Sequence, residues 1–150
     1  MAVDYVVFDD ENQSRLRSTV SDAKKVLPAD DIEDAITKHD NAPILCTILP
    51  QAESDGPLVA SKTNIDQREE LKVIVVVVAE SFRDKADGSA GAYRLIQKVK
   101  AAMRSKTWRN SQADGPFVFD RWVFMMRRGP RVAYQVEFHA TAVDDFQLAA

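Results

Sequence analysis

The chain has 150 residues, of which 45% are hydrophobic and 29% are charged, and its formal net charge is −3. Such a composition is typical of one globular domain that buries about two thirds of the surface its unfolded form exposes. It excludes a disordered or fibrous chain, and the negative balance excludes a global positive field that would attract nucleic acid or anionic membranes. We therefore predict a single domain over residues 1–150.

The amino-terminal segment combines a short apolar run, residues 5–8, with three acidic residues directly after it. We expect residues 1–11 to form either a short edge strand or an extended arm. A short apolar run suits strand addition to the sheet of a neighbouring subunit. Tyr5 and Phe8 are therefore candidate interface residues, and pairing within the chain's own sheet is the alternative.

Two helices are predicted next. From Asn12 to Leu27 apolar residues recur at helical spacing, and Pro28 ends the pattern. Residues 30–38 predict a shorter helix whose first turn is acidic. The helix dipole favours acidic residues there, so we prefer this explanation to a metal site.

Two strands follow, separated by a long polar stretch. Residues 43–50 predict a strand bracketed by prolines. Residues 51–70 are polar and lack a period, which indicates either a functional excursion or a hairpin with unresolved arms. Residues 71–79 contain five valines and one isoleucine, and both faces are apolar. We predict a central strand there, covered on both sides.

The segment after this strand predicts a helix that packs on the sheet. A polar turn ends in Asp87-Gly88-Ser89, where Asp87 or Ser89 can cap a helix that runs to Met103. Residues 105–115 form a polar connection carrying Trp108, which we expect to pack against the domain.

The last third predicts a β-hairpin. Residues 117–126 are strand-like, residues 127–131 supply turn chemistry, and residues 132–141 alternate between apolar and polar. Residues 142–150 are expected to form a flexible tail. These elements together predict an α+β fold, with a mixed, mainly antiparallel sheet of four to five strands and two or three packed helices.

The first strand of this hairpin is apolar on both faces. Strict alternation places Phe117 and Phe119 on one face, and Trp122 and Phe124 on the other. An uncovered second face exposes a large aromatic patch, which usually marks an interface. These four residues are therefore candidates for an oligomer interface. The alternative is that the helix over residues 12–27 or a loop covers that face.

The hairpin turn is basic. Arg127, Arg128 and Arg131 surround Gly129-Pro130, so three cations can meet an acidic partner surface or DNA phosphate. We take these arginines as candidate partner contacts, with a solvated turn as the alternative.

Motifs of catalysis and metal binding are absent from the sequence. His39 and His139 have no neighbours that make a triad or a ligand pair, and there is no glycine-rich phosphate loop. Cys46 stands among apolar residues and is expected to be a buried thiol. We expect no catalytic, cofactor-binding or metal site, and no enzyme.

The order of elements and several residues resemble Mu-like phage tail proteins of the tail terminator type. The resemblance rests on Ile32 to Ile36, a strand ending at Pro50, a valine-rich strand, Arg83, and a helix opening with Gly91 to Ile96. It covers roughly Asp30 to Val143, and the segment Met1 to Ala29 departs from it.

The resemblance implies a small α+β subunit of the virion tail, assembled in the host cytoplasm. Such a subunit forms a hexameric ring that ends polymerisation of the tail tube and joins the tail to the head connector. The implied partners are further copies of the chain, the tube protein with the sheath as an additional candidate, and the connector. DNA only passes through the ring, and no membrane or cofactor is implied. The alternatives are a head-to-tail connector or neck protein and, from another class, a small-molecule-binding module or enzyme.

Overall fold

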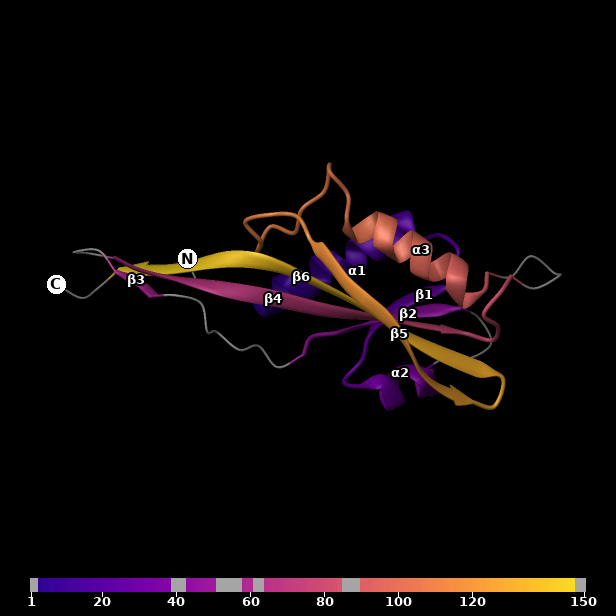
Figure 1. Cartoon of the computed structure of the whole chain (residues 1–150). Helices are drawn as coiled ribbons and strands as arrows, with labels where there is room; N and C mark the ends of the chain where they lie inside the picture. The colour runs from indigo at the N-terminus through magenta and orange to yellow at the C-terminus, as the bar shows by residue number, and fades with distance from the viewer. Residues whose placement is uncertain (1–2, 39–42, 51–57, 61–63, 85–89, 148–150) are drawn as a thin grey trace.

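The computed structural model describes residues 3–38, 43–50, 58–60, 64–84 and 90–147 (Figure 1). In chain order its elements are α1 (Tyr5–Thr19), β1 (Lys25–Pro28), α2 (Ile32–Lys38), β2 (Ile44–Ile48), β3 (Leu58–Ala60), β4 (Asn64–Ala79), α3 (Ala92–Met103), β5 (Val118–Arg128) and β6 (Arg131–Gln147). The predicted α+β class is confirmed, as is the mainly antiparallel sheet with packed helices. Within these ranges no helix is both long and apolar enough to cross a membrane.

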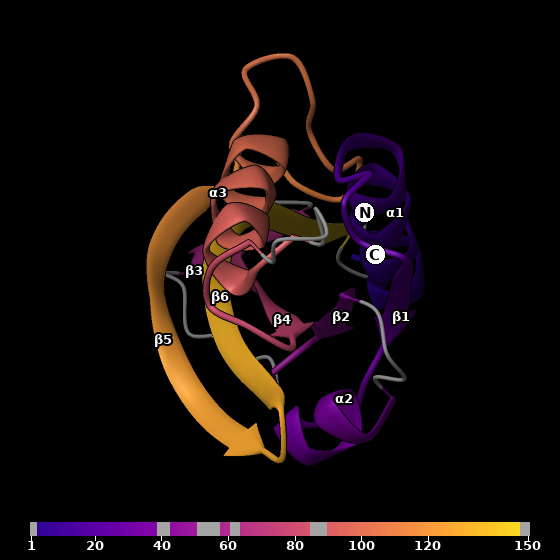
Figure 2. The same cartoon turned by 90° about the vertical axis from the view of Figure 1, so that its right-hand side faces the viewer.

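The sheet is ordered β1-β2-β4-β6-β5, and the short β3 pairs with β4 beside this path. The β1–β2 pair is parallel, whereas the other pairs are antiparallel. Helices α1 and α3 cover one face of the sheet and α2 covers the other (Figures 1 and 2). Strands β1 and β5 are therefore the two edges, on opposite sides of the molecule (Figure 2).

The core lies on both sides of β4, as its valine-rich sequence predicts. Val73, Val75 and Val77 belong to the core cluster under α1 and α3, and Val76 and Val78 belong to the cluster under α2. All five are fully buried, so β4 is a central strand covered on both faces. Cys46 is a buried free thiol in the second cluster, as expected.

The prediction of an edge strand or extended arm at residues 1–11 is wrong, because the helix α1 begins at Tyr5. The Asp4 carboxylate accepts hydrogen bonds from the backbone N–H groups of Val6 and Val7 at 3.0 and 3.1 Å. These bonds satisfy donors that the first turn of a helix leaves unpaired, which fixes the start of the helix.

The prediction of one helix from Asn12 to Leu27 is right only as far as Thr19. Residues Lys25–Pro28 form β1, which pairs in parallel with β2. Val26 is buried in the core between α1 and the sheet. Tertiary packing therefore overrides the helical spacing of the apolar residues in this segment.

The strands β4 and β6 form a long two-stranded ribbon. They pair along all 16 residues of β4, from Asn64 opposite Gln147 to Ala79 opposite Val132. The ribbon extends past the helices, with β3 beside its far end (Figure 1). Residues 142–147 are thus strand, which corrects the predicted flexible tail; residues 148–150 lie outside the described part.

The hairpin interpretation of residues 51–70 is confirmed where the structure describes them, because β3 pairs antiparallel with β4. Residues 51–57 and 61–63 lie outside the described ranges. The same holds for His39 and for Asp87 and Ser89, the predicted caps of α3. The N-cap position of α3 is occupied by Gly91.

Candidate subunit interface at the β5 edge

The candidate interface is built on β5, whose side chains depart from strict alternation. The β5–β6 register shifts between Phe119 and Arg121 and again between Phe124 and Met126. The extra residue at such a bulge shifts the alternation of side chains by one position, so that Phe119 shares a face with Trp122 instead of with Arg121. The predicted split of the aromatic residues between two faces is therefore wrong.

Ring contacts confirm that these aromatic residues share a face. Phe119 lies 5.8 Å from Phe138 between ring centroids, and Trp122 and Phe124 lie 5.6 and 5.5 Å from Tyr134. Tyr134 and Phe138 both point toward the core under α1 and α3. All three β5 side chains consequently lie on the side of the sheet that carries α3.

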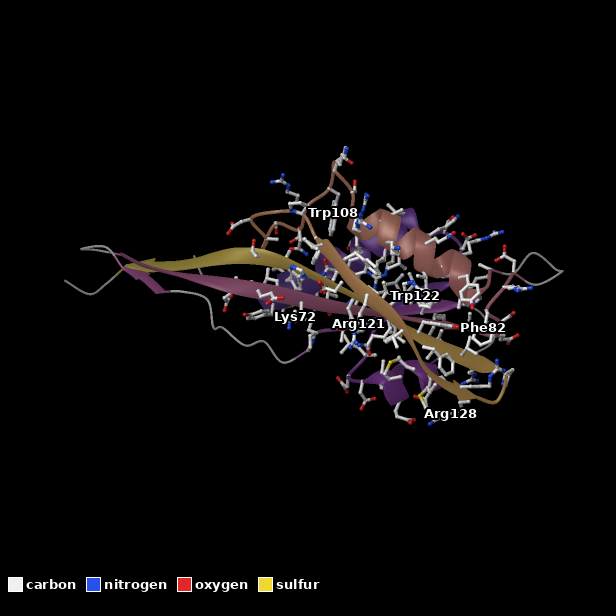
Figure 3. The ribbon with its side chains drawn as sticks, viewed as in Figure 1. Lys72, Phe82, Trp108, Arg121, Trp122 and Arg128 are labelled. Carbon is white, nitrogen blue, oxygen red and sulfur yellow. The ribbon has the colours of Figure 1, made fainter. Side chains whose placement is uncertain are left out.

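Five rings form one cluster at this edge, which we call the aromatic surface: Phe82, Tyr93, Trp122, Phe124 and Tyr134. Phe82 contacts Tyr93 and Phe124 at 6.0 and 6.3 Å, and Tyr93 contacts Trp122 at 6.3 Å. Figure 3 shows Trp122 and Phe82 near each other beside the end of α3. Rings at these separations favour one another beyond the area they bury.

The aromatic surface remains open to solvent. Tyr93, Trp122 and Phe124 are 46%, 44% and 46% exposed, whereas Tyr134 beneath them is buried. The alternative that α1 or a loop covers this face does not hold among the described residues. Neighbouring exposed aromatic rings of this size are typical of an interaction site.

The turn before α3 fixes Phe82 and Tyr93 in place. The backbone N–H of Tyr93 donates to the Phe82 carbonyl at 2.9 Å, and that of Gly91 donates to Asp84 Oδ1 at 3.0 Å. A side chain at Gly91 would overlap the backbone of Phe82 and Arg83, so only glycine fits there. The sequence analysis missed Phe82 and Tyr93 as interface candidates, although Phe82 is a large aromatic residue in an otherwise polar turn.

Tyr134 forms the floor of the aromatic surface. Burial, followed by its hydrogen bond with Tyr93, raises the pKa of Tyr134 from 10.0 to about 12. The Tyr134 hydroxyl therefore keeps its proton at neutral pH.

The remaining candidate interface residues have different positions. Phe8 and Phe117 are 1% and 5% exposed and contact each other at 5.9 Å, so they are core residues in this subunit. Their burial corrects the prediction that they offer an interface. Phe119 is partly buried, and Tyr5, at the start of α1, is partly exposed and donates to Glu69 Oε1.

The three turn arginines all contact their own chain. Arg128 pairs with Glu33 of α2, and Arg131 donates to the Ile36 carbonyl at 3.1 Å. The Arg127 guanidinium lies 5.4 Å from the centre of the Phe82 ring. Two arginines therefore attach the hairpin tip to α2, and Arg127 borders the aromatic surface; that the three arginines contact a partner stays a prediction.

The opposite face of the sheet carries polar side chains outside the apolar cluster under α2. A hollow of about 400 Å³ is lined there by polar and apolar residues, among them Lys72 and His139. His139 Nδ1 lies 2.7 Å from Asp120 Oδ1, and Arg121 pairs with Glu137. In the described part of the chain, no group of three or more His, Cys, Asp or Glu side chains could hold a metal ion.

The two edge strands of the sheet differ in whether their outward backbone groups have partners. At β1, Arg17 Nη2 donates to the carbonyl of Val26 at 2.9 Å, and Pro28 has no N–H to offer. Among the described residues, the outer edge of β5 has no backbone partner.

The chain was compared with known proteins. No protein-family model and no curated protein matches it.

Proposed function

We propose that this protein is a structural subunit of a phage tail, a terminator that forms a hexameric ring on the end of the tail tube. The ring ends tube polymerisation and presents its other side to the head connector. DNA passes through its centre. Two observations support the proposal: the resemblance over residues 30–143 and the exposed aromatic surface, which a neighbouring subunit would cover.

The observation that carries the proposal is the aromatic surface at the β5 edge. A lone subunit leaves Tyr93, Trp122 and Phe124 nearly half exposed, although the core beneath them is closed. Burying such rings between subunits is the usual source of affinity at protein interfaces. A ring of identical subunits places this surface against a neighbour in every copy.

The test is the mass of the purified protein, followed by its effect on tube growth. We expect six times the mass of one chain by light scattering at tens of micromolar. Electron microscopy with tail tube subunits should show tubes of limited length ending in a ring. Monomers under the first condition, or tubes of unlimited length under the second, contradict the proposal.

A matched pair of variants connects this test to the interface. Replacing both Trp122 and Phe124 by serine should abolish the ring while the subunit stays folded, because both side chains are half exposed. Met125 is 40% exposed on the same strand but does not belong to the aromatic surface. Met125→Ser should therefore leave the hexameric ring intact.

A further inference from the structure

We infer that the ring closes head to tail, with the aromatic surface of one copy bound to the first turns of α1 in the next copy. This inference rests on the proposed ring and names the second half of its interface. We call this second half the α1 patch; it consists of Tyr5, Val6, Val7 and Asp10.

The α1 patch is a second place, among the described residues, where large apolar side chains are exposed close together in the chain. Val6 is 71% exposed, and Tyr5 and Val7 are 38% and 37% exposed. The Asp4 cap and the hydrogen bond from Tyr5 to Glu69 hold this turn in one conformation. A rigid apolar patch loses little conformational entropy on binding, which favours its use as a contact.

The charges of the two surfaces are complementary. Arg127 lies over Phe82 and borders the aromatic surface, and Lys100 Nζ lies 4.4 Å from the centre of the Phe119 ring on the same strand, β5. Neither has a carboxylate partner among the described residues. Asp10 in the α1 patch is exposed and likewise has no partner in that part of the chain. Opposite charges around an apolar contact select the partner and its orientation.

The positions of the two surfaces fit a chain of contacts rather than a closed pair. Helix α1 lies toward the β1 side of the sheet and β5 lies at the opposite edge (Figure 2). Contact between two different surfaces is heterologous, and it generates a ring when the rotation between copies closes. An aromatic surface that bound its own counterpart would instead stop at a dimer.

The experiment uses two variants of the full chain, each damaged in one surface. Trp122→Ala removes the centre of the aromatic surface, and Val6→Asp places a charge in the α1 patch. Each variant alone should be monomeric, with at least a tenfold loss of self-association. An equimolar mixture should form a one-to-one heterodimer and nothing larger, because one intact contact remains per pair.

Controls and contrary results separate this inference from the proposed function. Ser18→Asp, on an exposed position later in α1, and Met125→Ala should keep the wild-type ring, and circular dichroism verifies folding of all four variants. A ring formed by Val6→Asp overturns the α1 contact but leaves the terminator proposal standing. A mixture that stays monomeric overturns the head-to-tail arrangement. A monomeric wild-type protein overturns both proposals.

Discussion

The two edges of the sheet differ in how well their own chain protects them: the outer edge of β1 is covered, and the outer edge of β5 is open. At β1 the edge is four residues long, and the Arg17 side chain of α1 donates a hydrogen bond to the carbonyl of Val26. At β5 the edge is 11 residues long, with exposed aromatic rings beside it. Natural proteins protect sheet edges with short strands, prolines, charges and bulges. Strand β1 has a proline and a covering arginine, whereas β5 has only its bulges and basic residues.

This difference indicates that the two edges of the sheet are not equally able to contact a neighbouring subunit. The β1 edge is sealed by its own chain, so it offers little backbone to a neighbour. The β5 edge carries rings that are fixed by the core beneath them but have no cover. A subunit with one closed and one open edge suits an assembly in which each copy uses different surfaces for its two neighbours.

The largest expected effect comes from breaking the support of the open edge at Gly91. Gly91→Ala forces a Cβ into the backbone of Phe82 and Arg83, and we expect a loss of about 3 kcal/mol in the free energy of unfolding. Gly115→Ala is the control, because a Cβ there meets nothing within 4 Å. Urea denaturation of both variants measures the difference. Equal midpoints for the two would show that the turn at Gly91 adjusts freely.

The closed edge should respond less strongly. Arg17→Ala removes the bonds to Gln13 Oε1 and to the Val26 carbonyl, at 3.0 and 2.9 Å. Because a partly buried charged donor is lost, we expect a destabilisation of about 2 kcal/mol, measured by urea denaturation. Lys24→Ala, an exposed change near the same edge, should stay within about 0.5 kcal/mol. A ring that persists in Arg17→Ala would agree with an interface located elsewhere.

The last effect is a dependence on pH at the floor of the aromatic surface, which develops only at alkaline pH. The pKa of Tyr134 is about 12 in the folded protein and 10.0 ordinarily, so the folded state keeps a proton that the unfolded chain releases between these values. Stability conferred by this group is complete below pH 10 and is lost as the pH rises toward 12, on the order of 1 kcal/mol per pH unit. Tyr134→Phe lacks this contribution.

Thermal or urea unfolding of the wild type and Tyr134→Phe at several pH values from 9 to 12 tests this expectation. The comparison between variants cancels the titration of lysines, which both proteins share. The stability advantage of the wild type should shrink across the interval. A constant difference would mean that Tyr134 titrates equally in both states.

The parts of the fold that were predictable are those in which local pattern and tertiary packing agree. The valine run of β4, the alternation of β6 and the stripe of α3 each match their observed burial. Helix α1 was obscured because it buries Asn12 and Gln13, so its apolar residues do not form a regular stripe. Asn12 Oδ1 accepts a hydrogen bond from Asn110 Nδ2 at 2.9 Å, from 98 positions away, whereas Asn12 Nδ2 has no partner among the described residues.

The candidate site was only partly predictable for a related reason. Trp122 and Phe124 could be identified as exposed aromatic residues, but the face they share with Phe119 depends on a bulge before Arg121 that no local residue pattern marks. Phe8 and Phe117 are also apolar and aromatic, yet they meet in the core across a separation of more than a hundred residues. Which aromatic residues remain outside is decided by long-range packing.

The ribbon of β4 and β6 has a mechanical consequence. Its strands lie antiparallel along all 16 residues of β4, about 50 Å at the rise of an extended strand. A force that pulls one strand lengthwise against the other acts on the whole ladder of hydrogen bonds at once, because these bonds run perpendicular to the strands. A force that peels the strands apart from the tip breaks the bonds in succession. The ribbon therefore resists a shearing force along its axis better than a force that peels its two strands apart.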